Sequence, residues 1–338
     1  MEPVLVLGGS GQAGAGTAAL LRRWYPTLPL TIAGRSIERA ERVADELGHA
    51  TAVTVDLGRA DLGLPAGGGH SAVVAAVWDD HLHGLRYAQQ RGVGYLSISS
   101  GLVDVAPEVV AGAQRPGASP ILLASHFCAG VGVLAALHVA RGIDRVDDIR
   151  IGVVLDEQDA GGPAGMADLE RLFTASSAGL VRRGGVFTWL AASEAQAQVR
   201  ALDGTVLPAH SIPVLDVPSL AHATGAPNVR FDHAVGESAG RRRGGRASIE
   251  VPIDVEGVGA AGAPLRTSRH LVHPDGQRPL TALGIALGVE RLLGLRGEPA
   301  PPGIHTPESL IDPAYAAERL SEIGATFVDA PMAEYQRV

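Results

Sequence analysis

The 338-residue chain contains no lysine and only one cysteine, Cys128. All 28 basic residues are therefore arginines, which stay protonated and cannot form a Schiff base. This excludes pyridoxal phosphate chemistry and the Tyr-x-x-x-Lys mechanism of short-chain dehydrogenases. A single cysteine excludes an internal disulfide and any metal cluster held by cysteines alone.

The sequence also lacks a long apolar run and an excess of positive charge. No stretch reaches the ~20 apolar residues of a membrane-spanning helix, and the N-terminus lacks the basic region and cleavage site of a signal peptide. We therefore expect a cytoplasmic protein with no membrane contact. The net charge of −8 argues against a nucleic-acid partner. A composition of 46% hydrophobic and 19% charged residues is that of a globular enzyme, and the length predicts about two domains.

Short apolar runs alternate with helical patterns in the first part of the chain. Val4 to Leu7 is an uninterrupted apolar run before glycine, typical of a strand buried on both faces. Further strands are expected at Leu30–Ala33, Ala52–Val55, Ala72–Val77, Tyr95–Ile98 and Ile121–Ala124, and helices at Gln12–Tyr25, Ser36–Leu47, Asp79–Gln90 and Val105–Ala113. This alternation predicts an α/β fold with a Rossmann-type, doubly wound parallel sheet.

The pattern changes after residue 130. Separated strands are expected at Asp148–Leu155, Gly185–Leu190, Gly204–Ile212 and Ala247–Glu256, with a helix near Met166–Leu180. They indicate a second α+β domain with a mainly antiparallel sheet. Helical patterns return at Thr281–Leu293 and over 307–324. We therefore expect a nucleotide-binding domain of residues 1–130 plus 280–338, and a second domain of residues 131–279.

A glycine-rich turn follows the first expected strand. Such a turn leaves the first N–H groups of the next helix pointing outward, where the helix dipole favours an anion. Two registers fit the sequence, Gly9-x-Gly11-x-x-Gly14 and Gly8-x-x-Gly11-x-x-Gly14. We prefer the second register because it begins where the strand ends. The turn predicts a dinucleotide-binding site.

The end of the second expected strand indicates which dinucleotide binds. NAD-specific sites place an acidic side chain there, whereas this chain has Arg35 and Ser36. Arg35 can pair with a 2′-phosphate and Ser36 can add a donor; alternatively, they are a surface arginine and a helix-capping serine. Asp56 could accept from the adenine amino group or cap a loop. We predict NADP(H), contacted by Gly8, Ser10, Gly11, Gln12, Ala13, Gly14, Arg35, Ser36, Asp56, Val77 and Trp78.

Several segments, in order along the chain, resemble the saccharopine dehydrogenase family and especially its NADPH-dependent saccharopine reductase-like branch. They are GGSGQAG, TIAGRSIERAERVADELG, VTVDL, SAVVAAVW, GVGYLSIS, RASIEVPIDVEG, TALGIALGVERLLG and PPGIHTPESL. The resemblance implies a Rossmann domain, an inserted substrate-binding and dimerisation domain, NADP(H) as cofactor and a homodimer. It also implies hydride transfer to a C=N bond of a small amino-acid- or polyamine-derived imine, or the reverse oxidation of a secondary amine.

The chain departs from this family at two places. The aspartate that often follows the tyrosine of the fifth strand is replaced in Tyr95-Leu96-Ser97, and the usual Pro-Gly pair is replaced in Phe127-Cys128-Ala129-Gly130. Family substrates therefore do not transfer directly. A stand-alone enoyl (C=C) reductase and a non-catalytic NADP(H)-binding sensor stay open as alternatives.

Candidate catalytic residues follow the expected strands, because ligands of doubly wound sheets bind beyond their carboxyl ends. His126 could supply a proton after hydride transfer, or it could simply be a hydrogen-bonded or capping residue. Asp79 or Asp80 could bind a substrate ammonium or cap a helix. Trp78 could border the nicotinamide or fill the core. A substrate imine that arrives protonated would need no acid from the protein.

Two further groups are candidates for ligand binding. His81, His83, His126 and Cys128 can be drawn as a zinc set, but residues two apart face different sides of a helix and the spacing is unfamiliar. We therefore expect no metal site. The arginine runs 182–183 and 241–243 could hold substrate carboxylates or lie in solvated hairpins.

Overall fold

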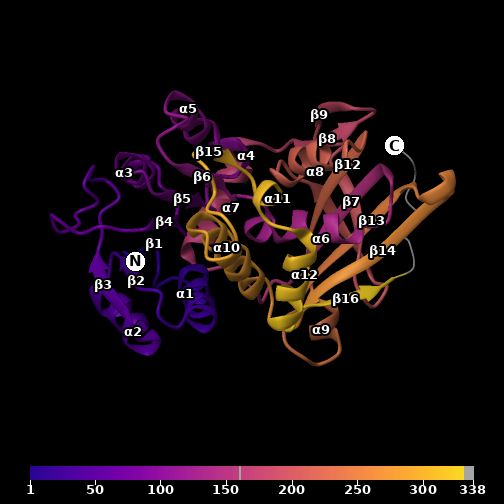
Figure 1. Cartoon of the computed structure of the whole chain (residues 1–338). Helices are drawn as coiled ribbons and strands as arrows, with labels where there is room; N and C mark the ends of the chain where they lie inside the picture. The colour runs from indigo at the N-terminus through magenta and orange to yellow at the C-terminus, as the bar shows by residue number, and fades with distance from the viewer. Residues whose placement is uncertain (160, 331–338) are drawn as a thin grey trace. The chain divides into compact units, whose positions relative to one another are not determined.

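The computed structural model describes residues 1–159 and 161–330, and Figure 1 traces their path. The chain forms two compact units. Unit 1 consists of residues 1–130, 161–172 and 280–311, and the described part of unit 2 consists of residues 131–159, 173–279 and 312–330. Each unit therefore contains more than one stretch of the chain.

Unit 1 is built on a seven-stranded sheet. Its strands are β1 (Val4–Leu7), β2 (Leu30–Gly34), β3 (Ala50–Thr54), β4 (Ala72–Ala75), β5 (Gly94–Ser97), β6 (Pro120–Leu123) and β15 (Gly303–His305). They lie in the order β15-β6-β5-β4-β1-β2-β3, and all neighbouring pairs are parallel. The strand order turns back at β1. In such a sheet, the crevice beyond the carboxyl ends of β1 and β4 is the usual ligand position.

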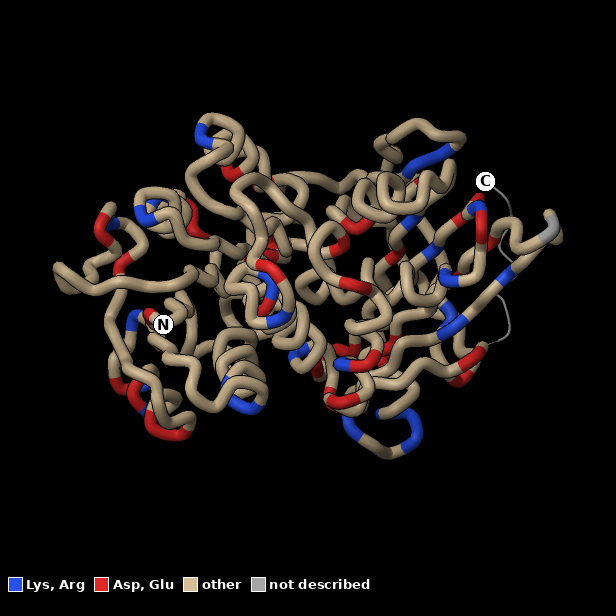
Figure 2. The backbone as a smooth tube through the Cα atoms, viewed as in Figure 1, with Lys and Arg blue, Asp and Glu red and all other residues tan. Residues whose placement is uncertain are grey.

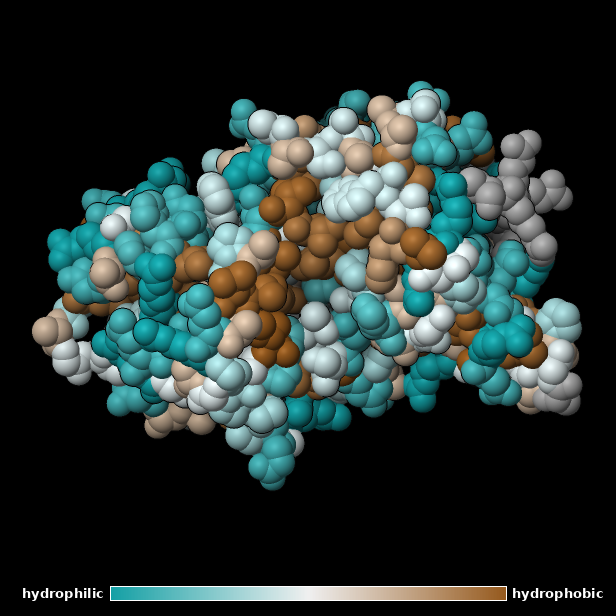
Figure 3. Space-filling model, turned by 90° about the horizontal axis from the view of Figure 1, so that it is seen from above, coloured by the Kyte–Doolittle hydropathy of each residue, from teal (hydrophilic) through white to brown (hydrophobic). Residues whose placement is uncertain are grey.

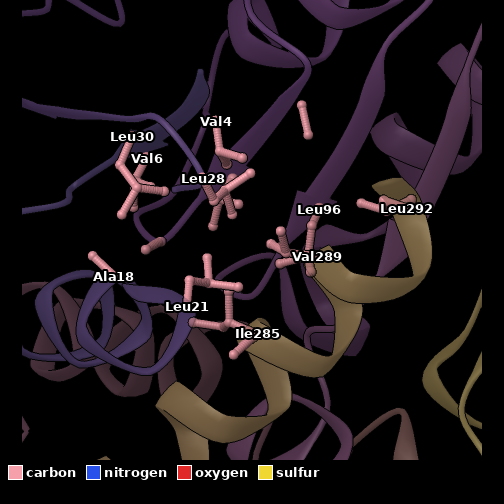
Figure 4. Packing of buried hydrophobic residues seen from close by; sticks show 14 of the residues in the cluster. Val4, Val6, Ala18, Leu21, Leu28, Leu30, Leu96, Ile285, Val289 and Leu292 are labelled. Carbon is pink, nitrogen blue, oxygen red and sulfur yellow. The ribbon is translucent and has the colours of Figure 1, made fainter. Parts of the chain in front are cut away.

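Helices pack on both faces of this sheet. They are α1 (Gln12–Trp24), α2 (Ile37–Leu47), α3 (His83–Arg91), α4 (Gly101–Asp104), α5 (Ala106–Gln114), α10 (Arg278–Leu293) and α11 (Pro307–Leu310). Val4 and Val6 lie in one apolar cluster, whereas Leu5 and Leu7 lie in another. Because side chains alternate across a strand, β1 is buried on both faces, as its uninterrupted apolar sequence predicts. Figure 4 shows the first cluster, where side chains of α1 and α10 meet those of the strands.

Helix α10 approaches the sheet closely through glycine. A Cβ atom on Gly288 would lie 2.4 Å from Leu96 Cδ1 and 2.8 Å from Leu122 Cδ2. Two residues further along, the fully buried Glu290 accepts a 2.6 Å hydrogen bond from the hydroxyl of Tyr25. The last long helix of unit 1 thus completes the core that the first strands begin.

Unit 2 is built on a nine-stranded mixed sheet. Its strands are β7 (Arg145–Leu155), β8 (Gly179–Arg183), β9 (Val186–Leu190), β10 (Gln196–Arg200), β11 (Val206–Ser211), β12 (Asn228–Val235), β13 (Ile249–Val258), β14 (Pro264–His273) and β16 (Thr326–Asp329). The main order is β10-β11-β12-β7-β13-β14-β16, with β8 between β12 and β9. The pair of β7 and β12 is parallel and the other described pairs are antiparallel. The predicted fold class is therefore confirmed.

Short helices complete unit 2. They are α6 (Val131–Val139), α8 (Asp216–Thr224), α9 (Ala239–Arg242), η2 (Ala260–Gly262) and α12 (Pro313–Glu322). The short helix η1 (Phe127–Gly130) ends the first stretch of unit 1, and α7 (Pro163–Ala175) begins in unit 1 and ends in unit 2. Helix α12 packs on α6, and β16 pairs with β14. Residues 312–330 therefore belong to unit 2, whereas the sequence analysis expects them in the nucleotide-binding domain.

Apolar residues also reach the surface. In unit 2, Val186, Phe187 and Trp189 of β9 are exposed. Figure 3 shows apolar side chains among polar ones on the face seen from above. Across residues 1–159 and 161–330, no helix combines the length and hydropathy that a membrane span requires.

The close packing of α10 predicts the cost of filling Gly288. In Gly288→Ala the new methyl group would push Leu96 and Leu122 from their positions, and overpacking of this kind costs about 1–3 kcal/mol. We expect a lower free energy of unfolding in urea. Gly117→Ala is the matched control because a Cβ atom there meets nothing within 4 Å. Equal unfolding midpoints for both variants would contradict this packing.

Candidate dinucleotide site

The carboxyl end of β1 meets the amino end of α1 in a tight glycine turn. Gly8 has a φ of +76°, a left-handed value that residues with side chains rarely adopt. The N–H of Gly9 donates to the carbonyl oxygens of Val6 and Ala33, both at 3.0 Å. Backbone hydrogen bonds alone thus hold the turn against β1 and β2.

The turn leaves almost no room for side chains. A Cβ atom on Gly14 would lie 2.5 Å from the carbonyl oxygen of Gly8, and one on Gly8 would lie 2.5 Å from Val77 Cγ1. A Cβ atom on Gly11 would have its nearest neighbour, the Gly8 oxygen, at 3.1 Å. Gly8 therefore makes the turn and Gly14 permits close packing of helix on strand, which matches the preferred register.

The amino end of α1 is open to an anion. Gly11 is its N-cap residue, no side chain caps it, and the first turn holds no acidic residue. The first N–H groups of a helix, here those of Gln12, Ala13 and Gly14, have no partner within the helix. Ser10 adds a hydroxyl from the same turn. This arrangement suits the pyrophosphate of a dinucleotide.

The end of β2 carries one exposed cation and a serine that is already engaged. Arg35 is exposed. Ser36 is the N-cap of α2, where its hydroxyl accepts from the N–H of Arg39 at 3.3 Å and donates to Glu38 at 2.7 Å. That hydrogen bond lowers the pKa of Glu38, so its carboxylate is charged at neutral pH. Figure 2 shows further acidic residues along α2. Arg35 is thus the residue of this pair with its side chain open to a ligand.

Two aspartates of the predicted site act as caps. Asp56 is exposed and accepts a 2.9 Å hydrogen bond from the N–H of Gly58, which closes its own loop. Asp79 is only 2% exposed, and its Oδ2 accepts from the N–H of Leu85 at 3.0 Å and from the Tyr95 hydroxyl at 3.2 Å. The carboxylate of Asp79 is therefore turned into unit 1. Its role toward a substrate ammonium stays a prediction that this geometry does not favour.

Trp78, three residues beyond β4, lies beside an arginine that the sequence analysis does not single out. Arg171 places its Cζ 3.8 Å from the centre of the Trp78 ring. The same guanidinium contacts Asp104 at 3.2 Å, Asp168 at 2.8 Å and the carbonyl oxygen of Ser99 at 2.8 Å. No motif marks Arg171, because it is distant in sequence and lies in a stretch expected to belong to the second domain.

A second group missed from the sequence surrounds a buried carboxyl. Glu108 of α5 is 2% exposed and accepts hydrogen bonds from the hydroxyls of Ser97, at 2.6 Å, and Ser100. The N–H of Ser100 in turn donates to Ser125 Oγ at 3.0 Å. Burial raises the pKa of Glu108, although the two hydroxyls oppose that shift. These groups join the ends of β5 and β6 to α5.

His126 follows β6 as predicted, but it is buried. Its burial lowers its pKa to about 3, so the imidazole is neutral at neutral pH. A neutral ring lacks the extra proton that an acid near pH 7 needs. Cys128 and Ala129, just beyond it, have φ values of +48° and +54°, and the Cys128 thiol is buried. The role of His126 as proton donor therefore stays a prediction without support from its surroundings.

The histidines considered for zinc do not lie on one helix, as the sequence analysis assumes. His81 lies before α3, so it does not share a helix with His83, and the two rings stack with centres 5.3 Å apart. His83 Nδ1 is 2.8 Å from the carbonyl oxygen of Leu57, and His81 Nδ1 is 2.6 Å from Asp80. Among the residues that the structure describes, no three histidine, cysteine or acidic side chains gather in a way that could hold a metal ion.

The arginine runs of unit 2 are largely engaged. Arg241 pairs with the buried Asp156 at 3.1 Å, and Arg242 pairs with Asp203 at 2.6 Å. Arg182 donates to two backbone carbonyl oxygens at 2.9 and 3.1 Å. Arg182 lies in the β8–β9 hairpin, as the hairpin interpretation expects, whereas Arg241 and Arg242 lie in the short helix α9 and not in a solvated hairpin.

Comparison with known proteins shows the fold. No family model and no curated protein sequence matches the chain. Saccharopine dehydrogenase (L-Glu forming) from Saccharomyces cerevisiae is similar in structure, with 11% identity, a TM-score of 0.65, and 97% of this chain and 100% of that one covered. A myo-inositol dehydrogenase from Corynebacterium glutamicum gives 14% identity, a TM-score of 0.47, and coverage of 98% and 100%. A scyllo-inositol dehydrogenase from Lactobacillus casei, solved with NAD(H) and scyllo-inositol, gives 13% identity and a TM-score of 0.47, with 96% of each chain covered.

The first likeness is a likeness of fold. At 11% identity it extends over nearly the whole of both chains and shows a shared fold. The fold of the resembled family is thus supported.

The burial of His126 predicts a pH dependence of stability. The unfolded chain binds a proton on His126 near pH 6.5, whereas the folded protein does so only near pH 3. The stabilisation is complete above pH 6.5 and is lost as the pH falls toward 3, at about 1.4 kcal/mol per pH unit. Urea unfolding at several pH values should show this slope as a difference between the wild type and His126→Gln. Parallel curves for the two proteins would contradict it.

Proposed function

We propose that the protein is an NADP(H)-dependent oxidoreductase that transfers hydride to the C=N bond of an amino-acid- or polyamine-derived imine. The observation that carries the proposal is the uncapped start of α1 behind a turn where Gly8 and Gly14 have no room for a Cβ atom. Backbone N–H groups at this position bind a pyrophosphate. The likeness of fold to a saccharopine dehydrogenase supports the class of chemistry.

The preference for NADP(H) rests on Arg35. The residues at the end of β2 include no acid to accept from the ribose 2′-hydroxyl, and the exposed guanidinium of Arg35 can pair with a 2′-phosphate. Ser36 and Glu38 oppose this preference in part, because the hydroxyl is engaged and the carboxylate is negative. Arg35 is therefore the main determinant in this proposal.

The choice of a C=N substrate agrees with the neutral state of His126 at neutral pH. A protonated imine carries its own proton and needs none from the protein. In unit 1 the buried His126 is neutral at neutral pH, so it is not suited to give up a proton, and the Asp79 carboxylate accepts a hydrogen bond from the N–H of Leu85 at the start of α3. An enoyl reductase must protonate a carbon and would need such a donor. This difference favours the imine over the alternative C=C substrate.

In this proposal, different residues of unit 1 bind different parts of the cofactor. In this proposal the glycine turn holds the pyrophosphate, Arg35 holds the 2′-phosphate, and the exposed Asp56 accepts from the adenine amino group. Val77 and Trp78 follow β4, and Val77 lies beside Gly8; in this proposal they shield one side of the nicotinamide from water. When bound, the nicotinamide supplies or accepts the hydride.

The assembly is proposed from the same resemblance. We infer a homodimer formed through the sheet of unit 2, which acts on a small-molecule substrate without a nucleic-acid or membrane partner. Sedimentation equilibrium tests it, because a monomeric mass would contradict the dimer without affecting the proposed chemistry.

The cofactor site is tested by substitution at Gly11. In Gly11→Val the side chain would stand where the pyrophosphate must approach the backbone, so we expect NADPH binding to weaken by about 100-fold, equivalent to roughly 3 kcal/mol. Isothermal titration calorimetry measures the affinity of both proteins for NADPH. Gly117→Val is the control, since a Cβ atom there meets nothing within 4 Å. Unchanged affinity in a folded Gly11→Val protein would refute the site.

The preference between cofactors is tested at Arg35. Removal of one charged hydrogen-bonding partner costs about 1.5–3 kcal/mol of binding free energy. We therefore expect Arg35→Ala to weaken the binding of NADPH by roughly 10- to 100-fold and the binding of NADH much less. Arg39→Ala, an exposed arginine one turn into α2, is the matched control. Equal losses for NADPH and NADH would remove the 2′-phosphate from the role of Arg35.

The reaction is tested by mixtures of candidate substrates. An amine supplied with a keto acid or an aldehyde should lead to oxidation of NADPH, measured by its absorbance. A response only to an unsaturated thioester would favour the enoyl reductase. Tight NADPH binding without turnover in either mixture would favour the sensor.

A further inference from the structure

Residues 161–172 bring Arg171 to unit 1 from chain that otherwise belongs to unit 2. The stretch begins near the glycine turn, where a Cβ atom on Gly162 would lie 3.6 Å from Gln12 Cδ. It ends with Arg171 stacked on Trp78. Both contacts lie at the carboxyl edge of the parallel sheet, where the dinucleotide is proposed to bind.

The guanidinium of Arg171 is held in a fixed plane. Its Nε contacts Asp104, and its Nη2 contacts Asp168 and the carbonyl oxygen of Ser99, all within 3.2 Å. The three charged side chains are each between 21% and 29% exposed. A planar group anchored from two of its nitrogens makes a rigid surface for an aromatic ring, which a lysine ammonium does not.

Trp78 needs such a support, because it lies in a loop. It follows β4 by three residues, and its side chain is 38% exposed. Its neighbour Val77 lies against Gly8 of the turn, so the loop that carries Trp78 borders the crevice between β1 and β4. Without the guanidinium on one face, the exposed ring would gain rotamers.

Direct recognition of a substrate carboxylate by Arg171 is the competing interpretation. Two carboxylates already contact its guanidinium, so its charge is more than neutralised before any substrate arrives. A third carboxylate would meet net negative charge. The contacts therefore favour a role for Arg171 in holding the ring.

We propose that Arg171 is a positioning residue that fixes the Trp78 indole at the nicotinamide end of the dinucleotide site. The proposal rests on the proposed function in one respect, namely that a dinucleotide occupies the crevice. It predicts that loss of the planar guanidinium frees the indole while the contacts of the pyrophosphate and the adenosine persist.

Tryptophan fluorescence can test this directly. The chain has three tryptophans, so Trp24→Phe with Trp189→Phe leaves Trp78 as the sole emitter. In this background we expect Arg171→Lys and Arg171→Ala to raise the acrylamide quenching constant about twofold, since the guanidinium covers one of the two ring faces. Energy transfer from Trp78 to bound NADPH should fall, with less than about a threefold change in NADPH affinity.

Arg91→Lys is the matched control. Arg91 also stacks on an aromatic ring of unit 1, with its Cζ 3.6 Å from the centre of Tyr87, but it lies in the last turn of α3. We expect this variant to leave both Trp78 signals unchanged. A matching change in Arg91→Lys would show a general loosening of unit 1 and would overturn the proposal.

The lysine variant separates stacking from charge. If Arg171→Lys behaves as the parent in both measurements, ion pairing alone suffices and the proposal is wrong. If the parent protein binds no NADPH, the proposed function fails, and the nicotinamide part of this inference fails with it. Acrylamide quenching of the cofactor-free protein still decides whether Arg171 holds the indole.

Discussion

The architecture of the candidate site depends on how closely α1 approaches the end of β1. The carbonyl oxygen of Gly8 lies 2.5 Å from the position of a Cβ atom on Gly14, so helix and turn touch through their backbones. This contact aims the first N–H groups of α1 at the crevice beyond the sheet. The loop after β4 also contacts the turn, because Val77 packs against Gly8. A side chain at Gly8 or Gly14 would separate the anion site from the residues that border the nicotinamide.

Much of unit 1 follows from local sequence, because β1, β2, β4, β5 and β6 are buried along their whole length, whereas the edge strands β3 and β15 are partly exposed. The runs at Val4–Leu7 and Leu30–Gly34 show this, and their positions agree with expectation to within a residue. In unit 2 the strands are less regular. The edge strand β10, with the sequence QAQVR, has no apolar run to reveal it, and β8 is hidden in the stretch expected to continue the helix of α7.

The candidate site also has one part that the sequence predicts and one part that it does not. Its backbone part could be predicted, because glycine spacing reports directly on φ and on close approach, as at Gly8 and Gly14. Its side-chain part could not, because burial is a property of the assembled fold. Nothing local shows that His126 is enclosed and neutral, or that Glu108 is surrounded by the hydroxyls of Ser97 and Ser100. Arg171 was missed for a related reason, since it reaches Trp78 across more than ninety residues of chain.

The composition of unit 1 from three separate stretches has a consequence for biosynthesis. The cluster around Val4 and Leu21 is closed by Ile285 and Val289, which leave the ribosome only after nearly all of unit 2 has been made. Throughout that interval the nascent Rossmann half exposes an apolar surface that its own chain cannot yet cover. Such a surface is a natural target for chaperones that bind growing chains, and slow translation between residues 131 and 279 would prolong its exposure to aggregation.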